Sequence, residues 1–168
     1  MSRWLSNRRN ALTALTALTA ASLAGCGFEL RRPPKLSFGS IALTGFGPRS
    51  PLADALRDQL AQQVRVLDGP DKAEVVLHAL ADLRERSVVA TTSAAQVREL
   101  QLRLKFNFRA HTPAGRELIP KAELLLSRDL NYSETAALAK EQEENELFRE
   151  MQNDVVGQVL RRLASVRV

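Results

Sequence analysis

The sequence predicts an α+β domain in which two helices pack on one face of a roughly four-stranded mixed sheet, forming a two-layer sandwich. Residues 97–110 alternate apolar and polar side chains with a period of two, as a strand with one buried face does. Residues 51–63 and 136–164 instead repeat apolar side chains every three or four positions, as amphipathic helices do. A sheet with one apolar face needs helices over that face, while its other face stays polar.

The first 25 residues have the organisation of a cleavable export signal. Residues 1–10 are polar with three arginines and no acidic residue, and residues 11–24 are the uncharged run ALTALTALTAASLA. This order matches the n-region and h-region of a secretory signal, and the apolar run is shorter than the ~20 residues of a comfortable transmembrane helix. The pair Arg8 and Arg9 also allows a twin-arginine signal, but an n-region carries positive charge in either case. We therefore expect ordinary Sec export and cleavage after residue 25.

The single cysteine of the chain, Cys26, ends the sequence LAGC at residues 23–26. This order resembles the lipobox of bacterial lipoproteins, which implies diacylglycerol on the thiol and an acyl chain on the new amino terminus. One acyl chain binds a membrane only marginally, at ~0.8 kcal/mol per buried methylene, so two or three chains make a stable anchor. Gly27 stands where lipoproteins retained in the inner membrane commonly carry aspartate, which favours the outer membrane. The alternative is a reduced cysteine in a retained hydrophobic helix.

The mature chain divides into a tether and one domain. Residues 26–35 hold the lipidated cysteine and the sequence RRPPK, whose consecutive prolines impose extended geometry. Residues 36–168 then form a single domain, because the length of the chain and its 45% of apolar residues suit one core.

The first half of this domain contains two predicted strands joined through a helix. Residues 36–43 form the first strand, and the glycine- and proline-rich turn TGFGPRSP ends it. Ser50 is suited to cap the helix at 51–63, and Pro51 to occupy its first turn. Residues 73–89 form a second strand region with an imperfect pattern. These two strands are expected to pair in parallel through a right-handed crossover.

The second half contains two more strands and the long helix. In the strand at 97–110 the inward side chains are Leu100, Leu102, Leu104, Phe106, Phe108 and Ala110, and the outward ones are Gln101, Arg103, Lys105, Asn107 and Arg109. A turn leads to a fourth strand at 117–130, which suits antiparallel hairpins. The helix at 136–164 begins with strongly charged turns and carries its apolar stripe later. We expect its C-terminal half to anchor it and its N-terminal half to face solvent or a partner.

Composition and motifs favour neither a nucleic-acid partner nor an enzyme. Removal of Arg3, Arg8 and Arg9 reduces the formal charge of +5 to +2, which is too weak a field to indicate nucleic acid. His78 and His111 are not near Cys, Asp or Glu at metal-ligand spacing, so we expect no metal and no cofactor. The acidic run is typical of a solvated helix face rather than of paired catalytic carboxylates, and its members are Glu141, Glu143, Glu144 and Glu146.

Several motifs in order along the mature chain resemble the LptE family of lipopolysaccharide-assembly lipoproteins. They are the lipobox followed by CGFELR, the strand VRELQLRLKFNF, and the C-terminal stretch SRDLNYSETAALAKEQEENELFREMQNDVVGQVLRRLASV. Within that last stretch, Arg128 with Tyr132 before the helix, LAK at residues 138–140 and RRL at 161–163 carry most of the resemblance.

The resemblance implies an outer-membrane lipoprotein, anchored through lipid on Cys26, that faces the periplasm and plugs the lumen of the β-barrel LptD. It further implies that the protein supports assembly of this barrel, takes part in inserting lipopolysaccharide into the outer leaflet, and has no catalytic activity. Two alternatives stay open: an accessory lipoprotein of another outer-membrane machine or a lipid carrier, and a periplasmic envelope hydrolase.

Four basic residues are candidates for contact with lipopolysaccharide. Lys140, in LAK, matches by position a lysine that the family uses toward this ligand; alternatively it is a solvated helix lysine paired with Glu143 or Glu144. The loop at 87–96, where the resemblance suggests a second basic contact, is uncharged. The other candidates lie on the polar side of the strand at 97–110, where a solvated sheet face is the alternative: Arg103, Lys105 and Arg109.

The lipobox generates a direct prediction. Metabolic labelling with a fatty acid should tag the wild-type protein and leave Cys26→Ser unlabelled, because the thiol is the attachment point of the diacylglycerol. Labelling is measured on the immunoprecipitated protein. Equal labelling of both proteins would contradict lipidation at this cysteine.

Overall fold

The computed structural model describes residues 34–168, so the predictions for the export signal and for Cys26 lie outside the described residues. Residues Pro34–Val168 group into one compact unit. Its elements in chain order are β1 (Ser40–Thr44), α2 (Pro51–Ala61), β2 (Arg65–Leu67), the short 3-10 helix η1 (Pro70–Lys72), β3 (Val75–Thr91), β4 (Val97–His111), β5 (Glu117–Asn131), the 3-10 helix η2 (Glu134–Ala136) and α3 (Ala137–Ala164).

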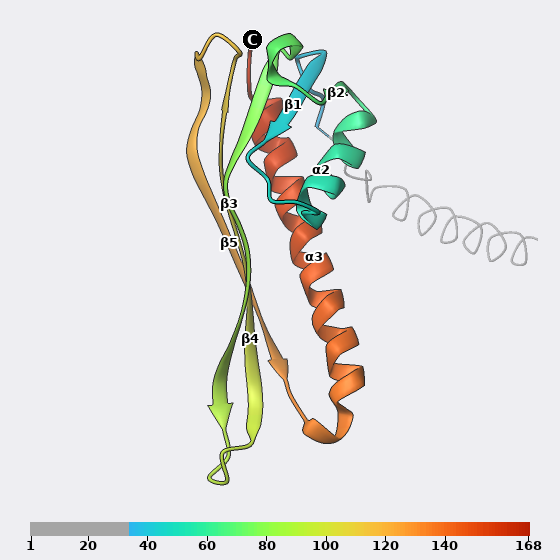
Figure 1. The fold of residues 1–168 in the computed structure, drawn as a ribbon, viewed down its shortest axis with the longest axis vertical. Helices are drawn as coiled ribbons and strands as arrows, with labels where there is room; N and C mark the ends of the chain where they lie inside the picture. The colour runs from blue at the N-terminus through green and yellow to red at the C-terminus, as the bar shows by residue number, and fades with distance from the viewer. Residues whose placement is uncertain (1–33) are drawn as a thin grey trace, which may run out of the picture. The chain divides into compact units, whose positions relative to one another are not determined.

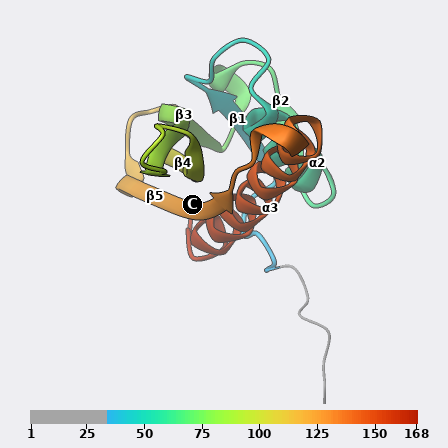
Figure 2. The same cartoon turned by 90° about the horizontal axis from the view of Figure 1, so that it is seen from below.

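The strands form one mixed sheet in the order β2-β1-β3-β4-β5 (Figure 1). β1 pairs in parallel with both β2 and β3, whereas β3, β4 and β5 form antiparallel hairpins. Both helices lie on one side of this sheet, as the two perpendicular views show (Figures 1 and 2). The predicted α+β sandwich is therefore confirmed, and so is the parallel pairing of the first two predicted strands.

The strand count is the main correction. The sheet has five strands rather than roughly four, because Arg65–Leu67 forms the edge strand β2 beside β1. Three residues are too short to show an alternating pattern, and their only strand partner is β1, so sequence periodicity could not reveal them. The first strand is also shorter than predicted, since β1 begins at Ser40 rather than at residue 36.

The N-terminus of α2 is capped as the sequence predicts and is also tied to the sheet. The Ser50 hydroxyl accepts a hydrogen bond from the Ala53 amide at 3.0 Å and donates one to Oδ2 of Asp82, on β3, at 2.6 Å. Pro51 occupies the first turn. The cap therefore fixes both the start of the helix and its position against β3.

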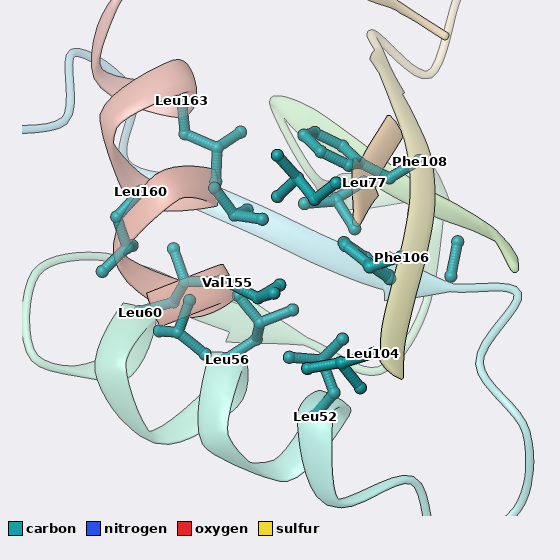
Figure 3. Close-up of a cluster of buried hydrophobic side chains, with 14 of the residues drawn as sticks. Leu52, Leu56, Leu60, Leu77, Leu104, Phe106, Phe108, Val155, Leu160 and Leu163 are labelled. Atoms are coloured by element: carbon teal, nitrogen blue, oxygen red, sulfur yellow. The ribbon is translucent and has the colours of Figure 1, made fainter. Parts of the chain in front are cut away.

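The apolar faces of β4 and of both helices meet in one core (Figure 3). Phe106 and Phe108 of β4 stack with their ring centroids 5.2 Å apart, and both are fully buried. Around them lie Leu52, Leu56 and Leu60 of α2, Leu77 of β3, and Val155, Leu160 and Leu163 of α3 (Figure 3). A fully buried side chain of this size stabilises the fold by about 1.5–3 kcal/mol, so this cluster dominates the stability of the domain.

The long helix α3 is anchored by its C-terminal half, as predicted. Its buried residues run from Phe148 to Leu163, and none lies in the first three turns of the helix. Gln152 is the one polar residue among them, and both ends of its amide are hydrogen-bonded: Oε1 accepts from Arg84 at 2.5 Å and Nε2 donates to the Pro51 carbonyl at 2.9 Å. This amide joins α3, β3 and the start of α2 at the edge of the core.

Gly45, directly after β1, is predicted to be essential for stability. Its φ is +79°, and a Cβ there would lie 2.3 Å from the Ala79 carbonyl oxygen. Gly45→Ala should lower the free energy of unfolding by about 2–4 kcal/mol, from left-handed backbone strain and overpacking. Gly47→Ala is the matched control, because a Cβ there meets no atom within 4 Å, and it should change stability by less than about 0.5 kcal/mol. Urea unfolding measures both, and equal midpoints would contradict the prediction.

Candidate functional site

The two histidines have local structural contacts. Nδ1 of His78 lies 2.9 Å from the Thr44 hydroxyl, and Nδ1 of His111 lies 2.8 Å from the Thr112 carbonyl oxygen. Within residues 34–168, no three or more His, Cys, Asp or Glu side chains are grouped closely enough to hold a metal ion.

The sheet has one face covered by the helices and one that they leave uncovered, here called the open face. Even-numbered residues of β4 from Leu100 to Phe108 are buried in the core, so the odd-numbered ones belong to the other side. Strand register then assigns the central part of the open face to six side chains: Leu83, Glu85, Arg103, Lys105, Glu123 and Leu125. Arg103, Lys105 and Arg109 thus share one face, as the alternation predicts.

Positive and negative charges alternate on the open face. Nζ of Lys105 lies 3.5 Å from Oε2 of Glu123. Nε of Arg103 donates to the Gln101 side chain at 2.7 Å, and the register places Glu85 directly across from Arg103. The three basic residues of β4 therefore do not form a concentrated positive patch, because acidic side chains stand among them.

Apolar side chains flank the central lysine of this face. Leu83, Lys105 and Leu125 are direct cross-strand partners on β3, β4 and β5. Leu83 is 48% exposed and Leu125 is 58% exposed. A strip of two leucines and a lysine stem thus crosses three strands in one row, a feature that the sequence analysis missed. The strand pairing that brings the two leucines together is not readable from local periodicity.

The burial of Asn107 differs from the pattern predicted for β4. The alternation places it among the outward polar residues, yet it is only 8% exposed. Its register partners are Ala81 and Glu123, beside the bulge that separates Ala79 from Ala81. Side chains on both neighbouring strands therefore cover it. Its Oδ1 atom is buried and has no hydrogen-bond partner among the described residues.

Lys140 lies in the other layer of the sandwich. It is in the first turns of α3, and its Nζ is 2.7 Å from Oε2 of Glu143. Because α3 covers the face of β4 opposite to Arg103, Lys105 and Arg109, the four predicted basic residues do not converge on one site. The pairing of Lys140 with Glu143 agrees with the alternative interpretation as a helix ion pair, while leaving the ammonium group at the surface.

Ion pairs connect α3 with the sheet along its length. Nη1 of Arg86 lies 3.2 Å from Oε2 of Glu144, and Nη2 of Arg128 lies 3.4 Å from Oδ2 of Asp154. The first of these pairs reaches the charged half of the helix, which therefore contacts β3 through charge rather than apolar packing. Both arginines pair across from a buried residue of β4, so their side chains lie on the helix-covered face of the sheet. The alternation of side chains along each strand is the sequence signal that indicates this face.

The hollows around the helices are small and have mixed linings. A groove of about 480 Å³ between α2 and α3 is lined by Asp58, Gln59 and Asn153 together with apolar side chains. A second hollow of about 270 Å³, at the start of α3, is lined mostly by polar residues, including Arg86, Tyr132 and Glu144. Neither has the apolar lining that acyl chains prefer.

Comparison with known proteins agrees with this architecture. Residues 38–163 match the model of the family LptE, described as lipopolysaccharide-assembly. The chain belongs to the LptE family. The match covers more than half of the chain and includes nearly all of the sandwich.

Relatives of this LptE-family lipoprotein match most of its chain, and a solved structure shares its fold. The LPS-assembly lipoprotein LptE of Yersinia enterocolitica is 30% identical over 149 residues, covering 85% of this chain and 70% of the relative. That of Pectobacterium atrosepticum is 26% identical over 147 residues, covering 85% and 79%. The solution structure of lipoprotein B from Nitrosomonas europaea superposes with a TM-score of 0.70 at 26% identity, covering 83% of this chain and 91% of that one.

Family membership makes this protein a lipoprotein of lipopolysaccharide assembly. The search for long, apolar helices found none that qualifies as a membrane span within the described part of the chain.

Proposed function

We propose that this LptE-family lipoprotein is held at the outer membrane by lipid on Cys26 and plugs an LptD-like β-barrel from the periplasmic side. In that position it supports assembly of the barrel and contacts lipopolysaccharide on its way to the outer leaflet. The observation that carries the proposal is the match of residues 38–163 to the family, combined with a fold that leaves one sheet face and half of α3 polar. Its mechanism is binding and scaffolding.

A polar, mixed-charge exterior suits the interior of a large barrel. Wide outer-membrane barrels have polar, wet lumens, so a plug needs polar surfaces together with a rigid core of its own. The open face and the charged half of α3 supply such surfaces, and the cluster around Phe106 and Phe108 supplies the core.

The first described residues lie at one end of the domain, and the charged N-terminal turns of α3 lie toward the other (Figure 1). The Ser37 hydroxyl donates to the Val166 carbonyl, so the start of the described chain is tied to the end of α3. From Leu163 to Lys140 the helix runs about 35 Å at 1.5 Å per residue. An extended tether from Cys26 to Pro34 reaches at most about 29 Å. A domain anchored in the inner leaflet and aligned with the barrel axis would therefore carry Lys140 across the ~30 Å hydrocarbon layer.

At that level the ammonium group of Lys140 is suited to meet a lipid phosphate. Its ion pair with Glu143 is half-exposed on the glutamate side, and exposed pairs of this kind contribute only about 0–1 kcal/mol. A phosphate is a stronger, doubly charged acceptor and can displace the carboxylate at little loss. Lysine binds such a group as a point charge, without demanding a fixed orientation.

Copurification from native membranes tests the proposed partnership. The tagged wild-type lipoprotein should recover a large, heat-modifiable β-barrel in a near-equal ratio, because a plug is buried in its partner. Mobility with and without boiling identifies the barrel. Recovery of the lipoprotein as a free monomer would contradict the plug and favour a lipid carrier; recovery with a different membrane machine would favour an accessory role there.

Lys140→Glu should weaken lipopolysaccharide binding several-fold at moderate salt, because it replaces the proposed phosphate contact with a like charge. Binding of labelled lipopolysaccharide to the purified complex measures the effect, while recovery of the barrel should stay unchanged. Arg149→Glu is the matched control, since Arg149 forms the same type of pair with Glu146 on the same helix, also at 2.7 Å. An equal loss of lipopolysaccharide binding in both variants, or no loss in either, would contradict the proposed contact. Lys140 would then be only a member of a solvated ion pair.

A further inference from the structure

The described chain begins between the C-terminal ends of the two helices. The Ser37 hydroxyl donates to the carbonyl of Val166, just after α3. The Gly39 carbonyl accepts at 3.0 Å from the amide of Arg65, in the strand that follows α2. Hydrogen bonds to the ends of both helices therefore fix the position from which the tether leaves the domain.

A groove of about 480 Å³ runs between α2 and α3, which lie side by side in both views (Figures 1 and 2). Val156 and Leu160 of α3 line it with apolar surface, and Asp58 of α2 stands exposed at its rim. Leu160 is about one turn from the end of α3 at Ala164, so the groove starts close to the fixed beginning of the described chain.

Side chains alternate between buried and exposed where the described chain begins. From residue 34 to residue 38 the even-numbered side chains are partly or fully buried, and the odd-numbered ones are exposed. Upstream, outside the described residues, the sequence keeps this phase with apolar Phe28 and Leu30 at even positions and charged Glu29 and Arg31 at odd ones. Such alternation is typical of an extended segment with one face against apolar surface.

The length of this upstream segment fits the groove. At about 3.3 Å per residue, an extended chain from Pro34 back to Phe28 covers about 20 Å. The far end of the groove, at Asn153, lies about 16 Å along α3 from Ala164. The consecutive prolines at 33 and 34 favour extended geometry at the junction.

Charge and chain connection also favour a contact within one molecule. Residues 28–32 hold two arginines and one glutamate, and their net positive charge is opposite in sign to Asp58 at the rim. The long stem of Arg32, which interrupts the apolar phase, can cover apolar surface while its charge stays in water. A weak contact suffices, because a short linker holds both parts at a high effective concentration.

We propose that residues 28–32 dock in the groove between α2 and α3 when the lipoprotein is free, with Phe28 and Leu30 against its apolar side chains. The docked tether continues the extended segment at the start of the described chain and holds Cys26 beside the helix layer. The full reach of about 29 Å is then available only after the tether leaves the groove. Docking and full extension are therefore alternative states of the anchor.

A single tryptophan tests the docking. The one tryptophan of the chain, Trp4, lies in the predicted export signal, so residues 26–168 contain none. Phe28→Trp is placed in residues 26–168 carrying Cys26→Ser, without lipid or detergent that would shield the ring. Its emission should be blue-shifted, and its quenching by acrylamide should be several-fold weaker than in Glu29→Trp, at the opposite phase. Equal quenching in the two variants overturns the docking.

Filling the groove should expel the tether. Gly157 lines the groove, and a Cβ there would lie 3.4 Å from Nη1 of Arg161, at the end of a flexible side chain. Gly157→Leu should keep or raise the melting temperature, because leucine is a better helix former than glycine. In the Phe28→Trp background it should raise acrylamide quenching to the level of the exposed control, whereas Gly157→Ala should not. Shielding that persists with leucine at this position overturns the assignment to this groove.

Dilution distinguishes the tether of the same chain from that of a second copy. Shielding in Phe28→Trp should stay constant across a dilution series in which size-exclusion chromatography shows a monomer. Shielding that disappears together with a dimer would assign the groove to a second molecule and overturn docking within one chain. These measurements use the free chain, so they stand or fall separately from the recovery of a barrel that tests the proposed function.

Discussion

The contact between the apolar face of β4 and the apolar stripe of α3 is the interaction on which the rest of the structure depends. Leu102, Leu104 and Phe106 on the strand, and Met151 and Val155 on the helix, are completely buried. At about 1.5–3 kcal/mol for each fully buried side chain, no set of surface pairs in the domain approaches this contribution. Because the buried stripe begins only at Phe148, the preceding turns of α3 are not packed into the core and carry charge.

One end of the domain is therefore held by apolar packing, and the other is held by ion pairs. The amide of Gln152 closes the edge of the core by joining α3 to Arg84 and to the start of α2. On the N-terminal side of Phe148, an ion pair between Arg86 and Glu144 connects the helix to the sheet, and its energy is small beside that of the core. Substitutions of charged side chains at this end should therefore affect the stability of the fold less than substitutions in the core.

The two polar surfaces of the sandwich differ in character. The open face combines matched charges with half-exposed leucines, whereas the charged half of α3 offers Lys140 in a surface ion pair that a stronger anion can displace. The two surfaces lie on opposite layers of the sandwich, so a contact made at one does not occupy the other.

Features that depend on nearest neighbours along the chain could be predicted from the amino-acid sequence. The alternation in β4, the stripe of α3 and the cap at Ser50 are local patterns, and the described structure agrees with each. Local patterns could not predict the strand order, the edge strand β2, the burial of Asn107 or the pairing of Lys105 with Glu123. These depend on the register between strands distant in sequence, and register decides which side chains cover or neutralise one another.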